Sequence, residues 1–446
     1  MCLQSRWTPM LCIFGTTLLS LLPYGALQAQ QSVQTDDSFL ERVDVDVLTP
    51  EQVQSLTAKA ESGNAQAQSM LGIAYYQGHS VARNDSEAAR WLTKAAVSDV
   101  PLAQAYLGQL YALGSGVAQS DSEAVKWYRK SADQGLAIGQ NNLGYMYFRG
   151  RGGLPQSYEE ALQWFRKAAT QNLAGAEVNL GIMYRDGKGT ASDYVEALQW
   201  FHKAASRGSA RAETELGLIY MKGEGVAKDY QKAFRFLKAG ADRGEPAAQS
   251  TLGVMYMNGY GVGRDYAQAL KWTKSAALTG LGEAAQNLGY LYDMGLGIVR
   301  DHQEAKRWYC VAAEKGVPAA QNTVAYYLAA ADGAHDYGKA AEWYAKAAAQ
   351  GLPAAQLNLG ILYTRGLGVP LDYIEAFAWL SAAKAGGSKD AVKELNSLRR
   401  IMTSQQIKVA EMRVAAGDVT LIKSEKQASL SPQDHCPLIS TTTARR

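Results

Sequence analysis

The sequence predicts an all-α protein, a right-handed α-solenoid of about nine 36-residue helix-turn-helix repeats with helical caps. The first observation behind this prediction is a Leu-Gly dipeptide that returns at a nearly fixed interval. It begins at Leu71, Leu107, Leu143, Leu180, Leu216, Leu252, Leu288 and Leu359, and Val324-Ala325 fills the one gap. The steps are 36 residues long, except for 37 residues into Leu180 and 35 residues into Leu359. Nine units therefore cover residues 65–388.

Two aromatic series follow the same register. A tyrosine stands four residues after the leucine, at Tyr75, Tyr111, Tyr147, Tyr184, Tyr220, Tyr256, Tyr292 and Tyr363, and Leu328 takes this place in the eighth unit. A tryptophan stands about twenty residues after the leucine, at Trp91, Trp127, Trp164, Trp200, Trp272, Trp308, Trp343 and Trp379, and Phe236 replaces it in the fifth unit. Buried aromatic side chains contribute much of a core's packing energy. We therefore expect both series to be core residues, not ligand contacts.

Each unit is predicted to contain two helices separated by glycines. Leu252 and Tyr256 stand four residues apart, so they share one face of a first helix. Glycine pairs such as Gly187 and Gly189 end this helix, because glycine readily adopts the left-handed conformation of a helix end. A capping residue then begins the second helix. The predicted caps are Asp85, Asp121, Ser157, Asp193, Asp229, Asp265, Asp301, Asp336 and Asp372, and several have an acid or amide three residues later, as in a capping box.

These residues closely resemble the Sel-one-like repeat (SLR) family, which is related to the tetratricopeptide repeat. The family pattern A-x-x-x-L-G-x-x-Y-x-x-G-x-G, followed by D-Y-x-x-A-x-x-W, is similar to PAAQSTLGVMYMNGYGVGRDYAQALKW at residues 246–272. The eighth unit departs from the pattern at Val324-Ala325, at Leu328 and in a shortened, glycine-poor loop, so we expect an irregular curvature there. The resemblance implies an α-solenoid that acts as a scaffold or adaptor, often in a bacterial envelope or at a host interface.

The N-terminus has the features of a secretory signal peptide. Arg6 precedes an apolar run at residues 10–22, and small residues end at Ala29, where we expect cleavage. The apolar run is too short to span a bilayer. We therefore predict an exported mature chain with a single pair of cysteines, Cys310 and Cys436, and the sequence leaves open whether they are bonded.

The remaining segments outside the repeats are predicted to be caps and loose ends. Residues 30–48 lack periodicity and are predicted to be a disordered linker, and residues 49–64 form an N-terminal capping helix that opens at Thr49. Residues 389–417 are predicted to be C-terminal capping helices, the last of them capped by Ser404. Residues 418–446 are predicted to be a disordered tail.

The composition argues against several functional classes. The chain has 45 Lys and Arg residues against 42 Asp and Glu residues, a net charge of +3, whereas a nucleic-acid binder needs a concentrated basic face. Four cysteines are too few for a disulfide scaffold or a cysteine-rich metal protein. The five histidines are scattered and form no HExxH motif. We therefore predict no catalytic residues, no cofactor, no metal, no nucleic acid and no membrane span in the mature chain.

Ser381 and Lys384 form the sequence's strongest enzymatic motif, a Ser-x-x-Lys. Penicillin-recognising enzymes use this spacing. Ser381, however, occupies a position that varies among the units, and no Lys-Thr-Gly follows. Some cysteine-rich relatives of the SLR family have been linked to β-lactam binding or hydrolysis, but their paired cysteines are absent from these repeats. A β-lactam-binding or hydrolysing envelope enzyme is therefore one alternative, and a scaffold for envelope polysaccharide secretion is another.

We expect a partner to bind a concave groove lined by the first helices, by analogy with tetratricopeptide arrays. If the leucine and the tyrosine face the core, the groove is lined by the residue two positions before the leucine and by those two, five and six positions after it. The predicted binding residues are Asn141, Tyr145, Phe148, Arg149, Ile182, Arg185, Tyr290, Asn322 and Tyr326. Aromatic side chains beside Asn and Arg suit an extended peptide, although exposed Tyr and Arg could equally serve to solvate the surface.

The sequence thus predicts a non-enzymatic exported scaffold or adaptor that binds a protein or peptide partner. The identity of the partner and the oligomeric state stay open. The compartment stays open as well, among the periplasm, the extracellular space and the lumen of the endoplasmic reticulum.

Overall fold

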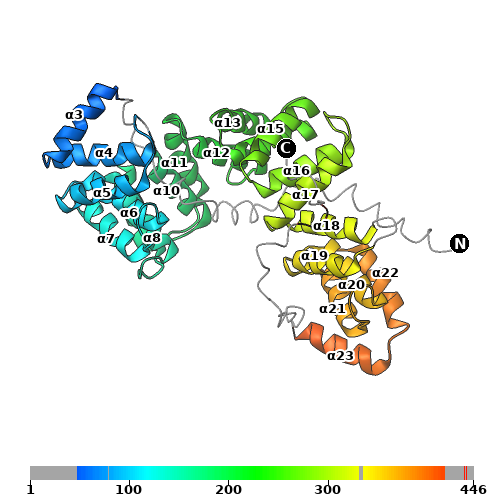
Figure 1. Ribbon diagram of the computed structural model, residues 1–446. Coiled ribbons are helices and arrows are strands. Elements are labelled where there is room, and N and C mark those ends of the chain that lie inside the picture. The colour runs from blue at the N-terminus through cyan, green and yellow to red at the C-terminus, as the bar shows by residue number, and fades with distance from the viewer. Residues whose placement is uncertain (1–47, 79, 331–334, 417–435, 437, 439–446) are drawn as a thin grey trace. The chain divides into compact units, whose positions relative to one another are not determined.

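The computed structural model describes residues 48–78, 80–330, 335–416, 436 and 438 (Figure 1). The chain divides into two compact units, Met1–Ser209 and Ala210–Arg446. Every regular element among the described residues is an α-helix, and consecutive helices pack as pairs, which confirms the all-α solenoid class. The predicted signal peptide and nearly all of the two terminal segments lie outside the described residues.

Each repeat contributes a first helix and a second helix of about the same length. The first helices are α4 (Ala65–Gln77), α6 (Pro101–Leu113), α8 (Ala137–Arg149), α10 (Ala174–Asp186), α12 (Ala210–Lys222), α14 (Pro246–Asn258), α16 (Gly282–Met294), α18 (Pro318–Ala330) and α20 (Pro353–Arg365). The second helices are α5 (Asp85–Val97), α7 (Asp121–Asp133), α9 (Tyr158–Ala169), α11 (Tyr194–Ser206), α13 (Tyr230–Asp242), α15 (Tyr266–Leu278), α17 (His302–Glu314), α19 (Tyr337–Ala349) and α21 (Tyr373–Ala385). α3 (Pro50–Glu61) precedes the repeats, and α22 (Lys389–Arg399) and α23 (Ser404–Ala415) follow them. None of the helices in the described residues is long and apolar enough to cross a membrane.

The caps of the second helices lie where they were predicted in seven units and one residue earlier in two. The N-caps of α5 and α7 are Asn84 and Ser120, whose side chains accept the backbone N–H of the residue three positions on. The prediction of Asp85 and Asp121 was wrong because these residues are the first helical residues. Asp121 instead forms an ion pair with Arg151 in the following loop, at 2.8 Å.

Reciprocal capping boxes form in the terminal helices. Thr49 and Gln52 exchange hydrogen bonds at the start of α3, and Thr403 and Gln406 do so at the start of α23. The last cap is therefore Thr403, and Ser404, the predicted cap, is the first residue of the helix. The predicted cap fails by one position because Thr403 keeps an extended backbone while its hydroxyl accepts the N–H of Gln406.

The large side chains at the centre of the core form a series of positions that the sequence pattern did not identify. The residue directly after each tryptophan position is at most 4% exposed; the series is Leu92, Tyr128, Phe165, Phe201, Leu237, Thr273, Tyr309, Tyr344 and Leu380. The predicted tyrosine series is only half-buried, and Trp127, Trp164, Trp200 and Trp308 are half-buried too. The tyrosines lie in the last turn of each first helix, so their rings cover the edge of the core and not its centre.

The glycine of the Leu-Gly dipeptide lies directly beneath this core series. A Cβ atom at Gly108 would stand 2.7 Å from the ring of Tyr128, and one at Gly181 would stand 2.5 Å from the ring of Phe201. Carbon atoms do not approach so closely, so an alanine would push the two helices apart. The repeated glycine therefore sets the close approach of the first helix to the second.

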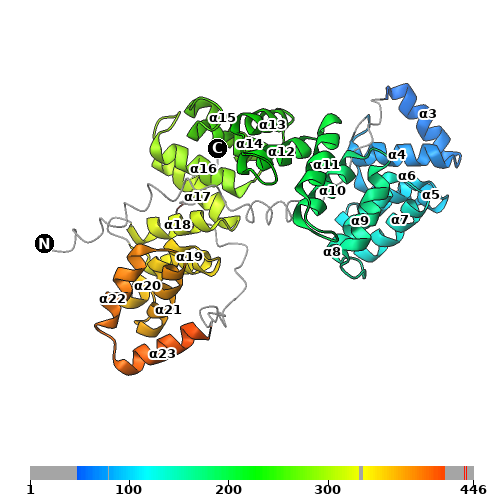
Figure 2. The same cartoon turned by 180° about the vertical axis from the view of Figure 1, so that it is seen from behind.

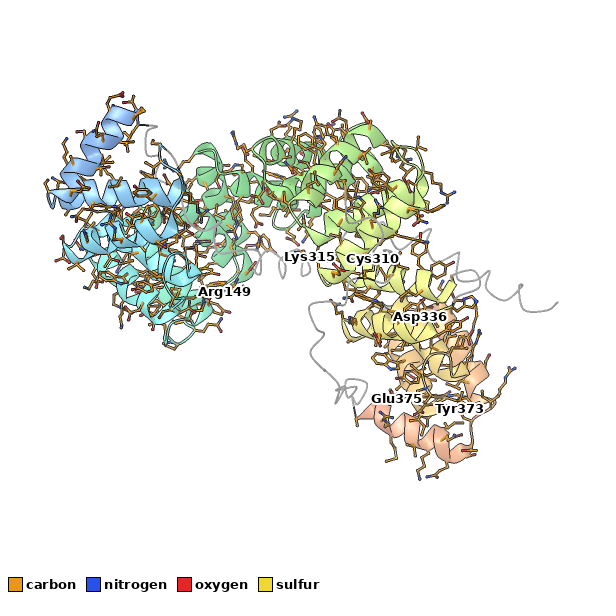
Figure 3. All side chains as sticks on the ribbon, in the orientation of Figure 1. Arg149, Cys310, Lys315, Asp336, Tyr373 and Glu375 are labelled. Carbon is orange, nitrogen blue, oxygen red and sulfur yellow. A yellow bond between two sulfur atoms is a disulfide. The ribbon has the colours of Figure 1, made fainter. Side chains whose placement is uncertain are left out.

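The two cysteines of the predicted mature chain are bonded to each other. Cys310 of α17 and Cys436 form a disulfide with their Cα atoms 5.5 Å apart (Figure 3 labels Cys310). The backbone N–H of Cys436 donates to Oε1 of Glu314, one helical turn beyond Cys310, at 2.9 Å. Leu438 packs, half-buried, against the same core cluster. A segment near the C-terminus is thus attached to the seventh repeat.

Candidate partner-binding surface on the first helices

The predicted binding residues fall in two separate places. Six of them, from Asn141 to Arg185, lie on α8 and α10 in the unit Met1–Ser209. Tyr290, Asn322 and Tyr326 lie on α16 and α18 in the unit Ala210–Arg446. Each group is therefore considered by itself.

Asn141 lies between neighbouring first helices instead of on a groove surface. It is 1% exposed, and its Oδ1 accepts a hydrogen bond from Nδ2 of Asn179 on α10 at 2.9 Å. Its own Nδ2 donates to Oδ1 of Asn142 at 3.2 Å. The bond to Asn179 joins α8 to α10, so Asn141 holds two repeats together and is not accessible to a partner.

Arg185, which was predicted to line the groove, is buried as well. Its side chain is 3% exposed, and its Nε donates to Oδ1 of Asp186 at 2.7 Å. Burying an arginine without a partner is costly, and the adjacent carboxylate offsets that cost. The position five residues after the leucine is equally buried in several other units, where Met221, Met257 and Asp293 occupy it. In the third unit the same position holds Phe148, which is only half-buried.

Tyr145, Phe148 and Arg149 form an accessible cluster on α8. All three are half-buried. Nε of Arg149 donates to the Tyr145 hydroxyl at 3.2 Å, and the guanidinium carbon lies 5.5 Å from the centroid of the Tyr145 ring and 5.9 Å from that of Phe148. A cation this close to an aromatic ring is attracted by the negative face of the ring. Figure 3 shows Arg149 on this part of the first unit.

Two residues that the sequence reasoning missed complete this cluster. Nζ of Lys188 lies 4.9 Å from the centroid of the Phe148 ring, and Tyr158 of α9 packs its ring 5.3 Å from Phe148. Lys188 also lies 3.5 Å from a carboxylate oxygen of Asp186. The signal for Lys188 was its place between Gly187 and Gly189 in the loop after α10, because Gly189 packs against the backbone of Tyr158 at the start of α9. We call Tyr145, Phe148, Arg149, Tyr158 and Lys188 the aromatic-cationic cluster.

The second group surrounds a buried carboxylate. Asp293 is 8% exposed, and its Oδ1 lies 2.6 Å from Nδ1 of His302 and accepts the Tyr327 hydroxyl at 3.1 Å. Burial and then the charge of Asp293 raise the pKa of Tyr327 and of Tyr309 well above that of an exposed tyrosine. The predicted residues Tyr290 and Tyr326 are half-buried beside this network.

Asn322 has the same role here that Asn141 has in the first unit. Its Oδ1 accepts from Nδ2 of Asn358 on α20 at 3.2 Å. Asn322 therefore joins neighbouring repeats, and it is half-buried, as Tyr290 and Tyr326 are, so all three predicted residues of this group stay partly accessible. Ile182, the remaining predicted residue, is half-buried on α10.

The described residues were considered for a metal site and for the Ser-x-x-Lys motif. No three His, Cys, Asp or Glu side chains in the described part of the chain are grouped as metal ligands would be. Ser381 is half-buried on α21, and Lys384 is exposed one turn further along.

The fold defines a helical repeat protein of the solenoid class, built from consecutive packed helix pairs. The Sel1 repeat model matches nine consecutive segments, residues 65–96, 101–136, 137–173, 174–209, 210–245, 246–280, 282–317, 318–352 and 353–388. The chain therefore belongs to the Sel1 repeat family. Proteins with Sel1 repeats generally mediate protein–protein interactions, and the family is typically non-catalytic.

Several solved structures are similar to this chain. One is c5321, a protective antigen present in uropathogenic Escherichia coli strains that displays an SLR fold, with 29% identity, a TM-score of 0.49 and coverage of 82% of this chain and 94% of that one. Another is a Sel1 repeat protein from Oxalobacter formigenes, with 36% identity, a TM-score of 0.49 and coverage of 55% and 96%. A third is a putative Sel1 repeat protein from Klebsiella pneumoniae subsp. pneumoniae, with 22% identity, a TM-score of 0.34 and coverage of 45% and 97%. No curated protein matches the chain.

Proposed function

We propose that this protein is an exported, non-enzymatic scaffold that binds a protein or peptide partner through the aromatic-cationic cluster. The observation that carries the proposal is the accessible pairing of Arg149 and Lys188 with the rings of Tyr145, Phe148 and Tyr158. Tyrosine and arginine are, with tryptophan, enriched among the residues that contribute most of the binding energy at protein interfaces. The two cations favour a carboxylate on the partner, and the rings favour an apolar side chain beside it.

The disulfide supports export. Disulfides persist in oxidising compartments such as the periplasm and the extracellular space and are rare in the cytosol. Cys310 and Cys436 are bonded and both are buried. Together with the features of residues 1–29, this bond favours a cell-envelope or host-interface location for the mature chain.

The binding surface can be tested by a double substitution, Tyr145→Ala with Arg149→Ala. We expect it to weaken capture of the natural partner from an envelope extract by about 2 kcal/mol or more, while the helix content stays unchanged. Partner identity comes from mass spectrometry of the material captured by the native protein. Arg185 is not used in this test, because its side chain is 3% exposed and its substitution would disturb packing.

A matched control is the pair Tyr184→Ala with Arg166→Ala. Arg166 donates to the Tyr184 hydroxyl at 2.6 Å, so this pair loses the same kind of tyrosine–arginine contact away from the cluster. Partner capture should survive this change. If the control pair abolishes capture and the cluster pair leaves it intact, the proposed surface is wrong.

Export is tested separately by the intact mass of the natively produced protein. We expect the first 29 or so residues to be missing, with the new N-terminus within a few positions of residue 30. A full-length chain found in the cytosol would refute export without bearing on the binding surface.

A further inference from the structure

The second helices of most repeats combine an acidic and a basic position. A glutamate stands four residues before the tryptophan position in six of the nine units, at Glu87, Glu123, Glu160, Glu196, Glu304 and Glu375. Where a cation stands one residue before the tryptophan in these units, the glutamate forms an ion pair with it. The pairs are Glu87 with Arg90 at 2.6 Å, Glu123 with Lys126 at 2.5 Å, and Glu304 with Arg307. In the eighth unit the two residue types are exchanged, as Lys339 and Glu342.

The second helices of the fifth and sixth repeats lack the acid but have the cations. Lys232 stands at the glutamate position of α13, and Gln268 stands there in α15. Arg235 and Lys271 occupy the position before the tryptophan, and Lys238 and Lys274 follow three residues later. A spacing of three places these residues along one side of each helix. We call Lys232, Arg235, Lys238, Lys271 and Lys274 the basic face.

The two parts of the basic face are neighbours within the unit Ala210–Arg446. α13 and α15 stand next to each other in both views of the chain (Figures 1 and 2). Nζ of Lys238 on α13 and Nζ of Lys271 on α15 lie 5.3 Å and 4.9 Å from the centroid of the Trp272 ring. The cations of the two helices therefore meet over this ring.

Most of these charges are accessible and lack an acidic partner. Arg235, Lys271 and Lys274 are exposed, and no carboxylate in the described part of the chain forms an ion pair with them. Lys238 pairs with Asp242 at 2.5 Å, and Lys232 lies 3.9 Å from Asp229. Like charges held side by side repel one another, so an anionic surface that covers the basic face would stabilise it.

The exposed side of α15 also carries an apolar residue. Leu278 is 69% exposed, and it follows Lys274 by four residues and Lys271 by seven, so the three side chains lie along one side of the helix. Between Tyr266 and Leu278, α15 contains no Asp or Glu. Cations beside an exposed apolar side chain suit the boundary of a bilayer, where lipid phosphates lie above the acyl chains.

The basic face is less suited to a protein partner. Residues that contribute most of the binding energy at protein interfaces are enriched in Trp, Tyr and Arg. Trp272, however, is only 8% exposed and is covered by two lysines. Four of the five cations are lysines, whose ammonium groups are point charges without the fork of donors that arginine offers to a single carboxylate. These features favour a surface with many negative charges over one acidic peptide.

We propose that the basic face of α13 and α15 binds the surface of a bilayer that contains anionic phospholipids. The lipid phosphates neutralise the cations, and Leu278 contacts the acyl boundary. Clusters of about four to eight Lys and Arg residues on a helical surface are typical of binding to anionic lipids. Exposed charges carry this association, so it weakens as the ionic strength rises. The surface is separate from the aromatic-cationic cluster and does not depend on the function proposed for that cluster.

The proposal can be tested by sedimenting the natively produced protein with lipid vesicles. At low salt, we expect binding to vesicles of phosphatidylglycerol and phosphatidylcholine, no binding to vesicles of phosphatidylcholine alone, and release by added sodium chloride. The double variant Lys271→Glu with Lys274→Glu should bind the mixed vesicles about tenfold more weakly or less. Arg235→Glu tests the same face from α13, without a change near Trp272, and should weaken binding by about threefold or more.

Lys384→Glu with Lys408→Glu is the matched control, because it makes the same change of net charge at exposed lysines of α21 and α23 in the same unit. Its vesicle binding should stay within about twofold of the native level, since these lysines lie outside the basic face. Absence of binding to the mixed vesicles, or an equal loss in the control and in the Lys271 and Lys274 variant, would overturn the proposal. Soluble poly-glutamate is the competing probe. If it binds through Lys271 and Lys274 while the vesicles do not bind, the face serves an acidic protein segment and the proposal is wrong.

Discussion

A single hydrogen atom in place of a methyl group sets how closely the two helices of a repeat can pack. In eight of the nine units, glycine follows the repeated leucine and lies beneath the side chain after the tryptophan position, which is large in seven of them and is Thr273 in the sixth. Ala325 replaces it only in the eighth unit, opposite Tyr344. Glycine costs helix stability relative to alanine, so its repetition in helix interiors indicates a packing requirement.

We predict that Gly181→Ala lowers the melting temperature of the protein. Its Cβ would lie 2.5 Å from the Phe201 ring, and such overpacking typically costs about 1–3 kcal/mol, more than the ~1 kcal/mol that alanine adds to helix propensity. Thermal unfolding followed by circular dichroism measures the effect. Gly263→Ala is the control, because a Cβ there meets nothing within 4 Å. Adding Phe201→Leu to Gly181→Ala should recover part of the loss, and a Gly181→Ala variant as stable as the native protein would contradict this account.

At the scale of one element, the start of α14 places a carboxylate at a position that is apolar in most repeats. The residue before the first helix is Val100, Leu136, Leu173, Leu281, Val317 or Leu352 in six units, and it is Glu245 before α14. Burial raises the pKa of Glu245, and the charge of Arg211 partly opposes this effect. The ionised carboxylate is therefore destabilised in the folded state.

We predict that Glu245→Gln raises the melting temperature at pH 7, by an amount equivalent to roughly 0.5–2 kcal/mol. Because the folded-state pKa is raised, the carboxyl penalises folding above its ordinary pKa and not below it, so the advantage should disappear by about pH 4. Glu245→Leu should keep its advantage at both pH values, because apolar burial does not depend on protonation. Melting curves of the three proteins at each pH make the comparison. An equal gain for Glu245→Gln at pH 4 and pH 7 would exclude the carboxyl charge as the cause.

At the scale of the whole chain, the periodic pattern predicted what lies within a repeat better than what lies between repeats. The helix pairs, the glycine loops and seven of nine second-helix caps could be predicted because each depends on residues less than one unit apart. The burial of Asn141 and Arg185 could not be predicted from the pattern. It depends on how the first helices of consecutive repeats pack against each other. For the same reason, the sequence predicted only the three residues of the aromatic-cationic cluster that lie on α8. Tyr158 and Lys188 belong to α9 and to the loop after α10.

The disulfide between Cys310 and Cys436 could not be predicted from the repeat pattern either, because 126 residues separate the two cysteines and only the folded chain brings them together. The loop they close contains the eighth repeat, which lacks the usual glycine and tyrosine, and the whole ninth repeat. In a repeat array, stability is close to a sum of unit and neighbour terms, so a weak unit is where the stack separates first. A covalent link that spans this unit restricts the unfolded chain.

We predict that Cys310→Ser lowers the melting temperature by the equivalent of about 2–5 kcal/mol, as the loss of a native disulfide typically does. Dithiothreitol should lower the native protein's melting temperature by a similar amount and leave the variant unchanged, which separates the bond from any packing effect of the substitution. The loss should be local because each repeat contacts only its neighbours. Hydrogen exchange should therefore quicken in α18 to α23, while α4 to α10 keep their native rates. A melting temperature insensitive to dithiothreitol in the native protein, or faster exchange spread evenly over all repeats, would show that the bond does not hold the C-terminal repeats together.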